Sequence, residues 1–451
     1  MNRRVVVVGG GIAGLTVAER LSAAPDADEF RIELRERSDR IGGALRTSPF
    51  AGRPAIDEGA DAFLARVPHG TALAERVGLA AELASPATGS ALVWHDGLHR
   101  IPDGLLLGVP GDLAALATSR LLSVRGKLRA AIEPLLPSTG ENGDSVGALV
   151  RARFGDEVHE RLVDALVGSI YAADTDRFSL AMVPQLSSLA SGQRSLLLAA
   201  RRARRAVPPV SGPVFHAPTS GMESLATAAA ERATRAGAVI RRSVAVDALA
   251  VDGAGWRVDD EPVDAVVLAT PAVDSAGLVI TSNPQLAALL RHSERASVAI
   301  VTLAVPTLPS SVRGLSGYLV PKPDQRLVTA ASFGSQKWTH WQGRDEIVRV
   351  SVGRDGLPID DLDDATLVDA AVSELGRHLG AVIQPTAVRL SRWPQAFPQY
   401  RPGHLDWLAA VDAATPPGLF LTGASYRGIG VPACIADAER TAAAVVGHLR
   451  R

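Results

Sequence analysis

The hydrophobic residues of the chain follow two patterns, which predict strands alternating with helices. Short apolar runs, typical of parallel strands buried on both faces, lie at residues 5–8, 31–34, 264–270 and 418–424. Apolar residues at helical spacing occupy residues 12–23, 225–236 and 432–449. Shorter strands are expected near residue 239, over residues 244–251 and around residue 256. The pattern predicts an α/β fold.

The middle of the chain predicts a separate helical region. Residues 105–210 carry apolar side chains at helical spacing, most clearly over residues 113–122 and 146–170. The alternation of apolar and polar residues that would indicate strands does not stand out there. A helical unit is therefore expected between parts of the α/β fold.

A glycine-rich turn follows the first predicted strand directly. Glycines at the spacing G-x-G-x-x-G form a tight turn, let the backbone approach a pyrophosphate, and let the helix pack closely with its positive N-terminus at the phosphates. Glu36 follows Gly14 by 22 residues, where a carboxylate accepts hydrogen bonds from a ribose diol. The sequence predicts dinucleotide binding by Gly9, Gly10, Gly11, Ile12, Ala13, Gly14 and Glu36.

Composition excludes several classes of protein. The 451 residues carry 47 Lys and Arg against 48 Asp and Glu, and this net charge of -1 argues against nucleic-acid binding. The single cysteine, Cys434, cannot form an intramolecular disulfide or a multi-thiolate metal site, and no metal is expected. Signal-peptide features are missing, and no uncharged run reaches the ~18 residues of a membrane-spanning helix. We expect a cytoplasmic protein of two or three domains.

Residues beyond Glu36 indicate which dinucleotide is bound. The R-x-G-G extension of FAD-containing amine-oxidase-like flavoproteins is similar to the segment that holds Arg37, Arg40, Gly42 and Gly43. Residues 57–63 (DEGADAF) resemble the segment that passes under the isoalloxazine in those proteins. Near the C-terminus, a strand that ends at Gly423 and a helix that begins after Gly430 are typical of the same enzymes. FAD is therefore favoured over NAD.

Narrower motifs resemble the porphyrinogen oxidase family over nearly the whole chain. The matching segments, in order, are IPDGL at 101–105, GVP at 108–110, RFGDEV at 153–158, GSIYAAD at 168–174, GYLVP at 317–321, SQKW at 335–338, RWPQAFPQY at 392–400 and GIGVPACI at 428–435. The RFGDEV helix and the compact length are most similar to the bacterial coproporphyrinogen III oxidases.

This resemblance implies a two-lobed, amine-oxidase-like fold that is α/β in its nucleotide part and α+β overall. A discontinuous FAD-binding domain is expected from residues 1–60, 211–272 and 410–451. A substrate-binding domain with a mixed sheet is expected from residues 61–104 and 273–409, and a helical domain from residues 105–210.

The resemblance also assigns residues to the site. It implies non-covalent FAD contacts for Arg37, Arg40, Gly42, Gly43, Ala44, Gly59, Ala60, Asp61, Ala62, Val244, Trp393, Gly423, Ile429, Gly430 and Val431. Gly317 and Leu319 are the substrate-facing candidates, although Leu319 and Trp393 also suit a packed core on spacing alone. Val67 stands where relatives often have a Lys or Arg near the substrate mouth, and the neighbouring Arg66 is expected to take the role of that basic residue. Asp437 stands where many relatives have Gly.

The implied activity is the FAD- and oxygen-dependent, six-electron oxidation of coproporphyrinogen III to coproporphyrin III in haem biosynthesis, with release of hydrogen peroxide. No protein acid or base is expected to be essential, because the macrocycle tautomerises and loses protons to water. Protoporphyrinogen IX oxidation is the nearest alternative, followed by amine oxidation and by flavin or porphyrin binding without turnover. No nucleic-acid partner is expected. Transient contact with a ferrochelatase and peripheral contact with a membrane stay open.

Two features have a structural interpretation that we favour over a functional one. Cys434, near the start of the last helix, suits a small buried hydrophobic residue better than a covalent flavin link. A run of arginines suits a solvated helix face better than a contact with anionic lipid or substrate; it comprises Arg194, Arg201, Arg202, Arg204 and Arg205.

Overall fold

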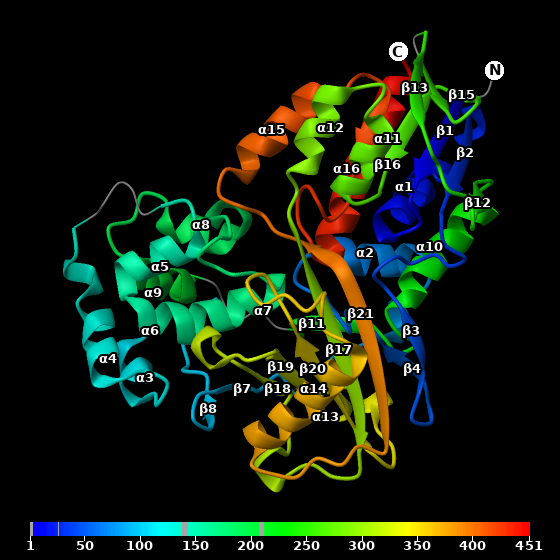
Figure 1. Ribbon diagram of the computed structural model, residues 1–451. Coiled ribbons are helices and arrows are strands. Elements are labelled where there is room, and N and C mark those ends of the chain that lie inside the picture. The colour runs from blue at the N-terminus through cyan, green and yellow to red at the C-terminus, as the bar shows by residue number, and fades with distance from the viewer. Residues whose placement is uncertain (1–2, 26, 138–142, 207–211, 254) are drawn as a thin grey trace.

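The computed structural model describes residues 3–25, 27–137, 143–206, 212–253 and 255–451. A five-stranded parallel sheet, a seven-stranded mixed sheet and a group of helices form three parts, with the helical part projecting to the left in Figure 1. The α/β prediction is confirmed. The expected boundary between residues 210 and 211 lies outside the described residues.

The five-stranded sheet brings together the beginning, middle and end of the chain. Its strands run in the order β12 (Val239–Arg241), β2 (Phe30–Arg35), β1 (Arg3–Val8), β16 (Ala265–Leu268) and β22 (Leu419–Leu421). All four pairings are parallel. The valines of β1 are almost completely buried because helices cover both faces of the sheet. One face packs on α1 (Ile12–Ser22), α10 (Glu223–Arg235) and α16 (Val431–Leu449).

The other face of this sheet carries three helices that lie mostly between the expected FAD-binding segments 211–272 and 410–451. Val6 and Val8 of β1 share a core with the helices α11 (Ala272–Val279), α12 (Pro284–Arg291) and α15 (His404–Ala414). Within residues 273–409, which are expected in the substrate-binding domain, α12 and most of α11 and α15 pack against the nucleotide sheet, and the expected domain bounds stay a prediction.

The strand expected over residues 244–251 is wrong in its first half. β13 begins only at Leu249 (Leu249–Asp252) and forms a small antiparallel sheet with β14 (Gly255–Val258) and β15 (Glu261–Val263). The N–H groups of Asp247 and Ala248 donate to the Asp259 carboxylate at 3.0 and 3.2 Å. These donors are satisfied outside a sheet, so no strand pairing is needed there.

The seven-stranded sheet has one covered face and one open face. Its strands run in the order β21 (Ala387–Pro398), β17 (Arg295–Val305), β20 (Glu346–Val352), β19 (Val328–Phe333), β18 (Gly317–Leu319), β7 (Ala91–Trp94) and β8 (Leu98–Arg100). Ala299, Val301 and Leu303 of β17 pack in one core with α14 (Asp364–Leu379). The alternate residues Val298, Ile300 and Thr302 therefore define the open face, which looks toward the other two parts.

The helical part follows the predicted pattern, except that one of its helices, His159–Gly168, is a π-helix. Its helices are α3 (Leu113–Thr118), α4 (Val124–Ala131), α5 (Val146–Phe154), α6 (Asp156–Val158), a π-helix His159–Gly168, α7 (Ser169–Tyr171), α8 (Pro184–Ala190) and α9 (Leu196–Ala206). Gly155, at φ 85°, separates α5 from α6. In the described part of the chain, no helix combines the length and apolar character that crossing a bilayer requires.

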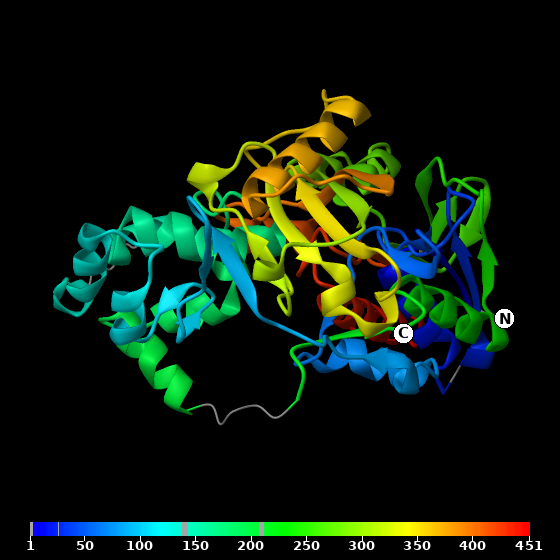
Figure 2. The same ribbon diagram turned by 90° about the horizontal axis from the view of Figure 1, so that it is seen from below.

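Short elements complete the fold, and the view from below shows the helical part again projecting to one side of the other two (Figure 2). The short elements are the hairpin β3 (Thr47–Phe50) and β4 (Arg53–Asp57), the strands β5 (Phe63–Leu64), β6 (Leu83–Ala84), β9 (Leu105–Leu106), β10 (Val109–Pro110) and β11 (Phe215–Pro218), and the helices α2 (Pro68–Arg76) and α13 (Gly334–Lys337).

Candidate functional site

The glycine-rich turn between β1 and α1 is shaped by contacts that only glycine allows. A Cβ at Gly14 would lie 2.0 Å from the carbonyl oxygen of Gly9. Gly9 itself has a φ of 107°, a conformation that favours glycine. Gly11 forms the N-cap of α1 without a side-chain hydrogen bond, so the first N–H groups of the helix are left for another acceptor. The turn therefore presents backbone donors and a positive helix end.

Glu36 lies beside this turn at the end of β2. Its carboxylate accepts hydrogen bonds from the Gly10 N–H at 2.6 Å and from the Ser38 N–H at 2.9 Å. The Val244 N–H donates to the Glu36 carbonyl oxygen at 2.9 Å. The structure thus brings together two predicted cofactor residues that are far apart in the sequence.

The loop that carries Arg40, Gly42 and Gly43 packs against the same turn. The Gly42 N–H donates to the Gly10 carbonyl at 2.8 Å, and a Cβ at Gly43 would lie 3.1 Å from the Gly11 Cα. Arg40 holds the loop by donating to the Gly43 carbonyl at 2.9 Å and to the Leu45 carbonyl at 2.6 Å. Arg37 is exposed and pairs with Asp274 at 3.6 Å.

Residues 58–61 connect the nucleotide part to the open face of the seven-stranded sheet. The indole Nε1 of Trp393, on β21, donates to the Glu58 carbonyl at 3.0 Å. A Cβ at Gly59 would lie 2.7 Å from the Ala44 carbonyl oxygen and 3.2 Å from the Trp393 ring. Four predicted cofactor residues, Ala44, Gly59, Asp61 and Trp393, therefore gather at the junction of the two sheets.

Asp61 is held by partners that the sequence interpretation did not assign to the site. Its carboxylate contacts Lys337 at 2.9 Å, Arg349 at 3.3 Å and the indole N–H of Trp338 at 3.2 Å. Burial alone raises the pKa of Asp61, but Lys337 and Arg349 outweigh it and hold the pKa well below its usual range. Lys337 and Trp338 belong to the SQKW motif, which is the one sequence signal that pointed to them.

Asp57, just before this segment, provides a pH-dependent test of local packing. Burial is the largest cause that raises the pKa of Asp57 to about 6 from 3.8, against hydrogen bonds from Thr47 and the Met222 N–H. A raised carboxyl pKa makes the folded state lose stability as pH rises from about 4 to about 6. Asp57→Asn should therefore be more stable than wild type above pH 6, by up to about 3 kcal/mol, with no difference below about pH 4. Urea unfolding across this pH range measures the effect, and a constant difference at all pH values would contradict it.

The C-terminal loop places a second helix start beside the first. Gly430 is the N-cap of α16 and has no side-chain cap, and a Cβ at Gly423 would lie 3.9 Å from the Ala13 Cβ. Buried Asp437 holds the loop by accepting from the Thr422 hydroxyl at 2.9 Å and the Gly423 N–H at 3.1 Å. The departure at Asp437 therefore has a structural role as the anchor of this loop.

Cys434 is buried under the same loop. Its Sγ lies 3.5 Å from the Gly428 carbonyl oxygen. Burial raises the pKa of the Cys434 thiol to about 12. The thiol is therefore protonated at neutral pH, and its environment is that of a buried apolar residue.

Strand register sets the predicted substrate residues on the open face of the seven-stranded sheet. One row of directly paired residues crosses the sheet as Leu319, Ala330, Ser351, Ile300 and Ser391. The neighbouring row on the same face is Gly317, Ser332, Arg349, Thr302 and Arg389. Gly317 and Leu319 thus share a face with Arg349, which donates to the Gly59 carbonyl and pairs with Asp61.

A cavity of about 70 Å³ lies between this open face and the π-helix. Its lining comprises Ala165, Gly168, Ser169, Ala172, Val298, Ile300, Gln325, Thr329, Ser351, Gly353, Arg354 and Phe397. Gly317, Leu319 and Arg66 are not among these residues. Arg66 is exposed between β5 and α2, and the five arginines of the predicted basic run are exposed on or next to α9.

Comparison with known proteins identifies the family. A family model described as flavin containing amine oxidoreductase matches residues 12–446. The chain is 35% identical to a coproporphyrinogen III oxidase of Mycobacterium leprae over the whole of both chains. The chain belongs to the porphyrinogen oxidases of this flavin family.

Further relatives of this porphyrinogen oxidase support the same assignment. A coproporphyrinogen III oxidase of Bacillus subtilis is 30% identical, with 96% of each chain covered. A solved structure from Exiguobacterium sp. 255-15, named for protoporphyrinogen oxidase, superposes over all of both chains with a TM-score of 0.86 at 29% identity. The predicted family, the two-lobed flavin fold and the FAD-dependent oxidoreductase class are confirmed.

Proposed function

We propose that this chain catalyses the oxidation of coproporphyrinogen III to coproporphyrin III in haem biosynthesis. Six hydrogens leave the macrocycle in three two-electron steps, and three molecules of oxygen are reduced to three of hydrogen peroxide. The observation that carries the proposal is the arrangement of the open sheet face. Arg349 and Trp393 contact residues 58–61 there, and the row from Leu319 to Ser391 includes residues that line the cavity. The choice of coproporphyrinogen III is supported by full-length similarity to enzymes of that name.

The residues around the glycine turn fit an FAD molecule. Glycines at positions 11, 14, 43 and 59 keep the backbone free of Cβ atoms, and the uncapped starts of α1 and α16 supply N–H donors. Glu36 would accept from the ribose, Val244 would lie at the adenine, and residues 59–62 with Trp393 and residues 429–431 would flank the isoalloxazine. When bound, FAD accepts two electrons from the substrate in each round and passes them to oxygen.

The residues of the open face support orientation of the substrate over acid–base catalysis. The row from Leu319 to Ser391 consists of apolar and hydroxyl-bearing side chains, without a group that titrates near neutral pH. The charged side chains of the adjacent row, Arg349 and Arg389, are held by contacts to residues 48–61. In this proposal the protein orients the macrocycle against the flavin and excludes side reactions, while pyrrole protons leave to water.

An amine oxidase is disfavoured by the aromatic residues near the C-terminal loop. Tyr426 is completely buried, and its ring stacks on Trp407 at 6.1 Å and 10°. The Tyr400 hydroxyl donates to the Ala424 carbonyl, and its ring packs on His404. Both rings are committed to the core, so they do not supply the aromatic cage that an amine substrate would need.

The deciding experiment mixes flavin-loaded protein anaerobically with coproporphyrinogen III, protoporphyrinogen IX or a primary amine. Bleaching of the flavin by coproporphyrinogen III, followed by porphyrin fluorescence and hydrogen peroxide on admission of air, is the expected result. A clear preference for protoporphyrinogen IX in kcat/KM would establish the alternative substrate. Bleaching by the amine alone would overturn the proposal, and oxidised flavin with every substrate would indicate a binding protein.

We also expect the flavin to be bound without a covalent link. Acid precipitation of the wild-type protein should release all of its flavin as intact FAD, because the Cys434 thiol is buried and protonated. Cys434→Ala should release the same amount. Flavin that stays with the wild-type precipitate but not with the Cys434→Ala precipitate would contradict this expectation.

A further inference from the structure

Arg354 is the one basic side chain on the wall of the cavity between the open sheet face and the π-helix. It follows β20 and is only 5% exposed. Its Nη1 and Nη2 atoms donate to the two oxygens of Asp164, at 2.8 and 2.9 Å, and Nη2 also donates to the Ala173 carbonyl. Its Nε atom is buried and has no hydrogen-bond partner within the described residues. One donor of a fixed guanidinium is therefore unused.

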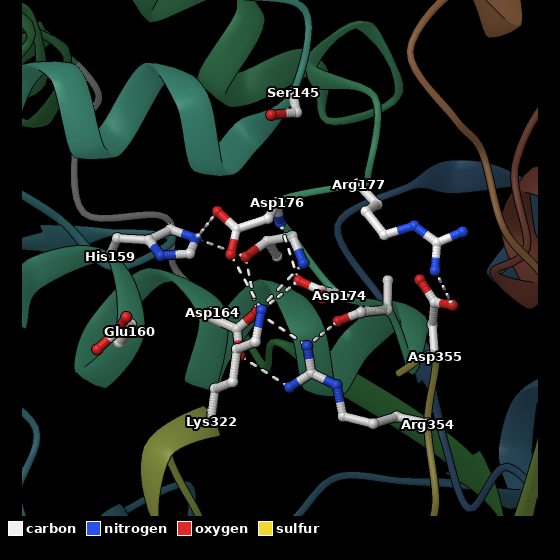
Figure 3. A network of polar contacts seen from close by, with 12 residues as sticks. Ser145, His159, Glu160, Asp164, Asp174, Asp176, Arg177, Lys322, Arg354 and Asp355 are labelled. Atoms are coloured by element: carbon white, nitrogen blue, oxygen red, sulfur yellow. Dashed lines mark hydrogen bonds and ion pairs between the residues drawn. The ribbon is translucent and has the colours of Figure 1, made fainter. Parts of the chain in front are cut away.

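The Arg354 guanidinium belongs to a cluster of ion pairs that holds it in place (Figure 3). Asp164 belongs to the π-helix and also accepts from the Thr175 hydroxyl at 2.6 Å. Lys322 pairs with Asp174 at 2.7 Å and with Asp176 at 3.0 Å. The Asp164 oxygens are thus occupied by Arg354 and Thr175, and neither Asp164 nor Lys322 belongs to the cavity lining. The cluster positions Arg354 without adding an anion to the cavity wall.

Gly168 gives Arg354 the space to lie at the cavity. A Cβ on Gly168 would lie 3.1 and 3.2 Å from the two terminal nitrogens of Arg354. Ser351, near the end of β20 and three residues before Arg354, lines the same cavity. The cavity wall thus holds both a guanidinium and a serine hydroxyl, and donors of these two kinds match the lone pairs of a carboxylate.

We propose that this cavity binds one propionate arm of the porphyrinogen, with Arg354 Nε–H and the Ser351 hydroxyl as its donors. The assignment rests on the proposed porphyrinogen oxidase reaction and names the anchor of its substrate. Arg354 and Ser351 are positioning residues that touch the arm at a distance from the reacting carbons.

The size of the cavity agrees with a side arm. A volume of about 70 Å³ holds roughly five to seven water-sized groups, comparable with the three carbons and two oxygens of a propionate. The macrocycle itself is too large for this space. It would lie outside, over the row that begins at Leu319.

The position of the cavity relative to Trp393 also agrees with a propionate arm. Phe397 lines the cavity and lies four residues beyond Trp393 on β21, at most roughly 13 Å along the strand. Trp393 contacts the segment proposed to flank the isoalloxazine. A macrocycle set against that segment would extend an arm toward Phe397 and Arg354.

The test uses two variants of the cavity and one matched control, all as flavin-loaded full-length protein. Ser351→Asp places a like charge beside the arm. The double variant Arg354→Gln/Asp164→Asn removes the charged guanidinium and its Nε–H without leaving a buried charge unpaired. Lys322→Met breaks neighbouring ion pairs of the same cluster but lies outside the cavity lining. The measurements are KM and kcat for coproporphyrinogen III, and Kd for coproporphyrin III and for its uncharged tetramethyl ester by fluorescence quenching.

Both cavity variants should raise the Kd of the tetra-acid and the KM about tenfold or more, with kcat and the Kd of the ester within about twofold of wild type. Lys322→Met should leave the acid-to-ester preference unchanged. An unchanged preference in folded, flavin-loaded Ser351→Asp would overturn the anchor while leaving the proposed reaction intact. If no porphyrinogen bleaches the flavin of the wild-type protein, both the proposed reaction and the proposed anchor are overturned.

Discussion

Substitution of Gly14 by alanine is expected to give a protein that loses its flavin during purification and unfolds more readily than wild type. The new Cβ would lie 2.0 Å from the Gly9 carbonyl oxygen and 3.1 Å from the Ala269 Cβ, so the start of α1 must move away from β1 and β16. Overpacking of this kind costs about 1–3 kcal/mol or more. The N–H donors proposed for the pyrophosphate move with the helix, and we expect the Kd for FAD to rise about 100-fold or more. Flavin content after gel filtration and thermal unfolding measure both effects.

Gly11 provides a control three residues away in the same turn. Its φ is −74°, and nothing lies within 4 Å of a Cβ built there. Gly11→Ala should therefore fold and melt like the wild-type apoprotein, with weaker FAD binding because the Cβ enters the space that a pyrophosphate approaches. Gly277→Ala, in α11 with open space around its Cβ, should change neither property. Normal flavin content in Gly14→Ala would show that the turn tolerates a displaced helix.

The parts of the fold that could be predicted from sequence are those with local causes. Residues 5–8 are buried on both sides, and their continuous apolar run predicts a central parallel strand. The strand expected over residues 244–251 is missing over residues 244–248, because the Asp259 carboxylate, in the turn after β14, accepts the hydrogen bonds of Asp247 and Ala248. Local apolar character cannot indicate such a partner.

The position of α11, α12 and α15 on the nucleotide sheet depends on contacts between residues that are far apart in the sequence. The amphipathic pattern of a helix such as α12 predicts a helix but not the surface that it covers. The shared core with Val6 and Val8 shows that they cover the nucleotide sheet. Division of the chain by motif order could not reveal this, because the helices lie between the motifs of the two sheets.

The residues of the candidate site also fall into those that local spacing predicts and those that only the folded structure brings together. The glycine turn and Glu36 have fixed spacings imposed by a strand, a turn and a helix, and could be predicted. Arg349 meets Asp61 only through sheet register, and Arg354 meets Asp164 across 190 positions. With 47 cationic and 48 anionic side chains in the chain, charge alone does not indicate which pairs are buried.

Removal of the Glu133 carboxylate is expected to cause a large loss of stability in the helical part. Glu133 is completely buried and pairs with Arg153, which is itself 3% exposed. The same carboxylate accepts from the Ser195 hydroxyl and from the N–H groups of Leu196 at 2.9 Å and Leu197 at 3.3 Å, so it also caps the start of α9. Glu133→Ala leaves a buried guanidinium without its counter-ion and should lower the free energy of unfolding by about 3–5 kcal/mol.

The cause of this loss can be separated by a control and a paired variant in urea unfolding. Glu231→Ala removes an exposed pair with Arg235, with side chains 61% and 67% exposed, and should change the free energy by less than about 0.5 kcal/mol. Glu133→Leu/Arg153→Met removes both buried charges. If it recovers most of the loss, the penalty comes from the unpaired guanidinium. If it stays as unstable as Glu133→Ala, the cap of α9 is the larger contribution, and that helix depends on a carboxylate supplied from outside its own sequence.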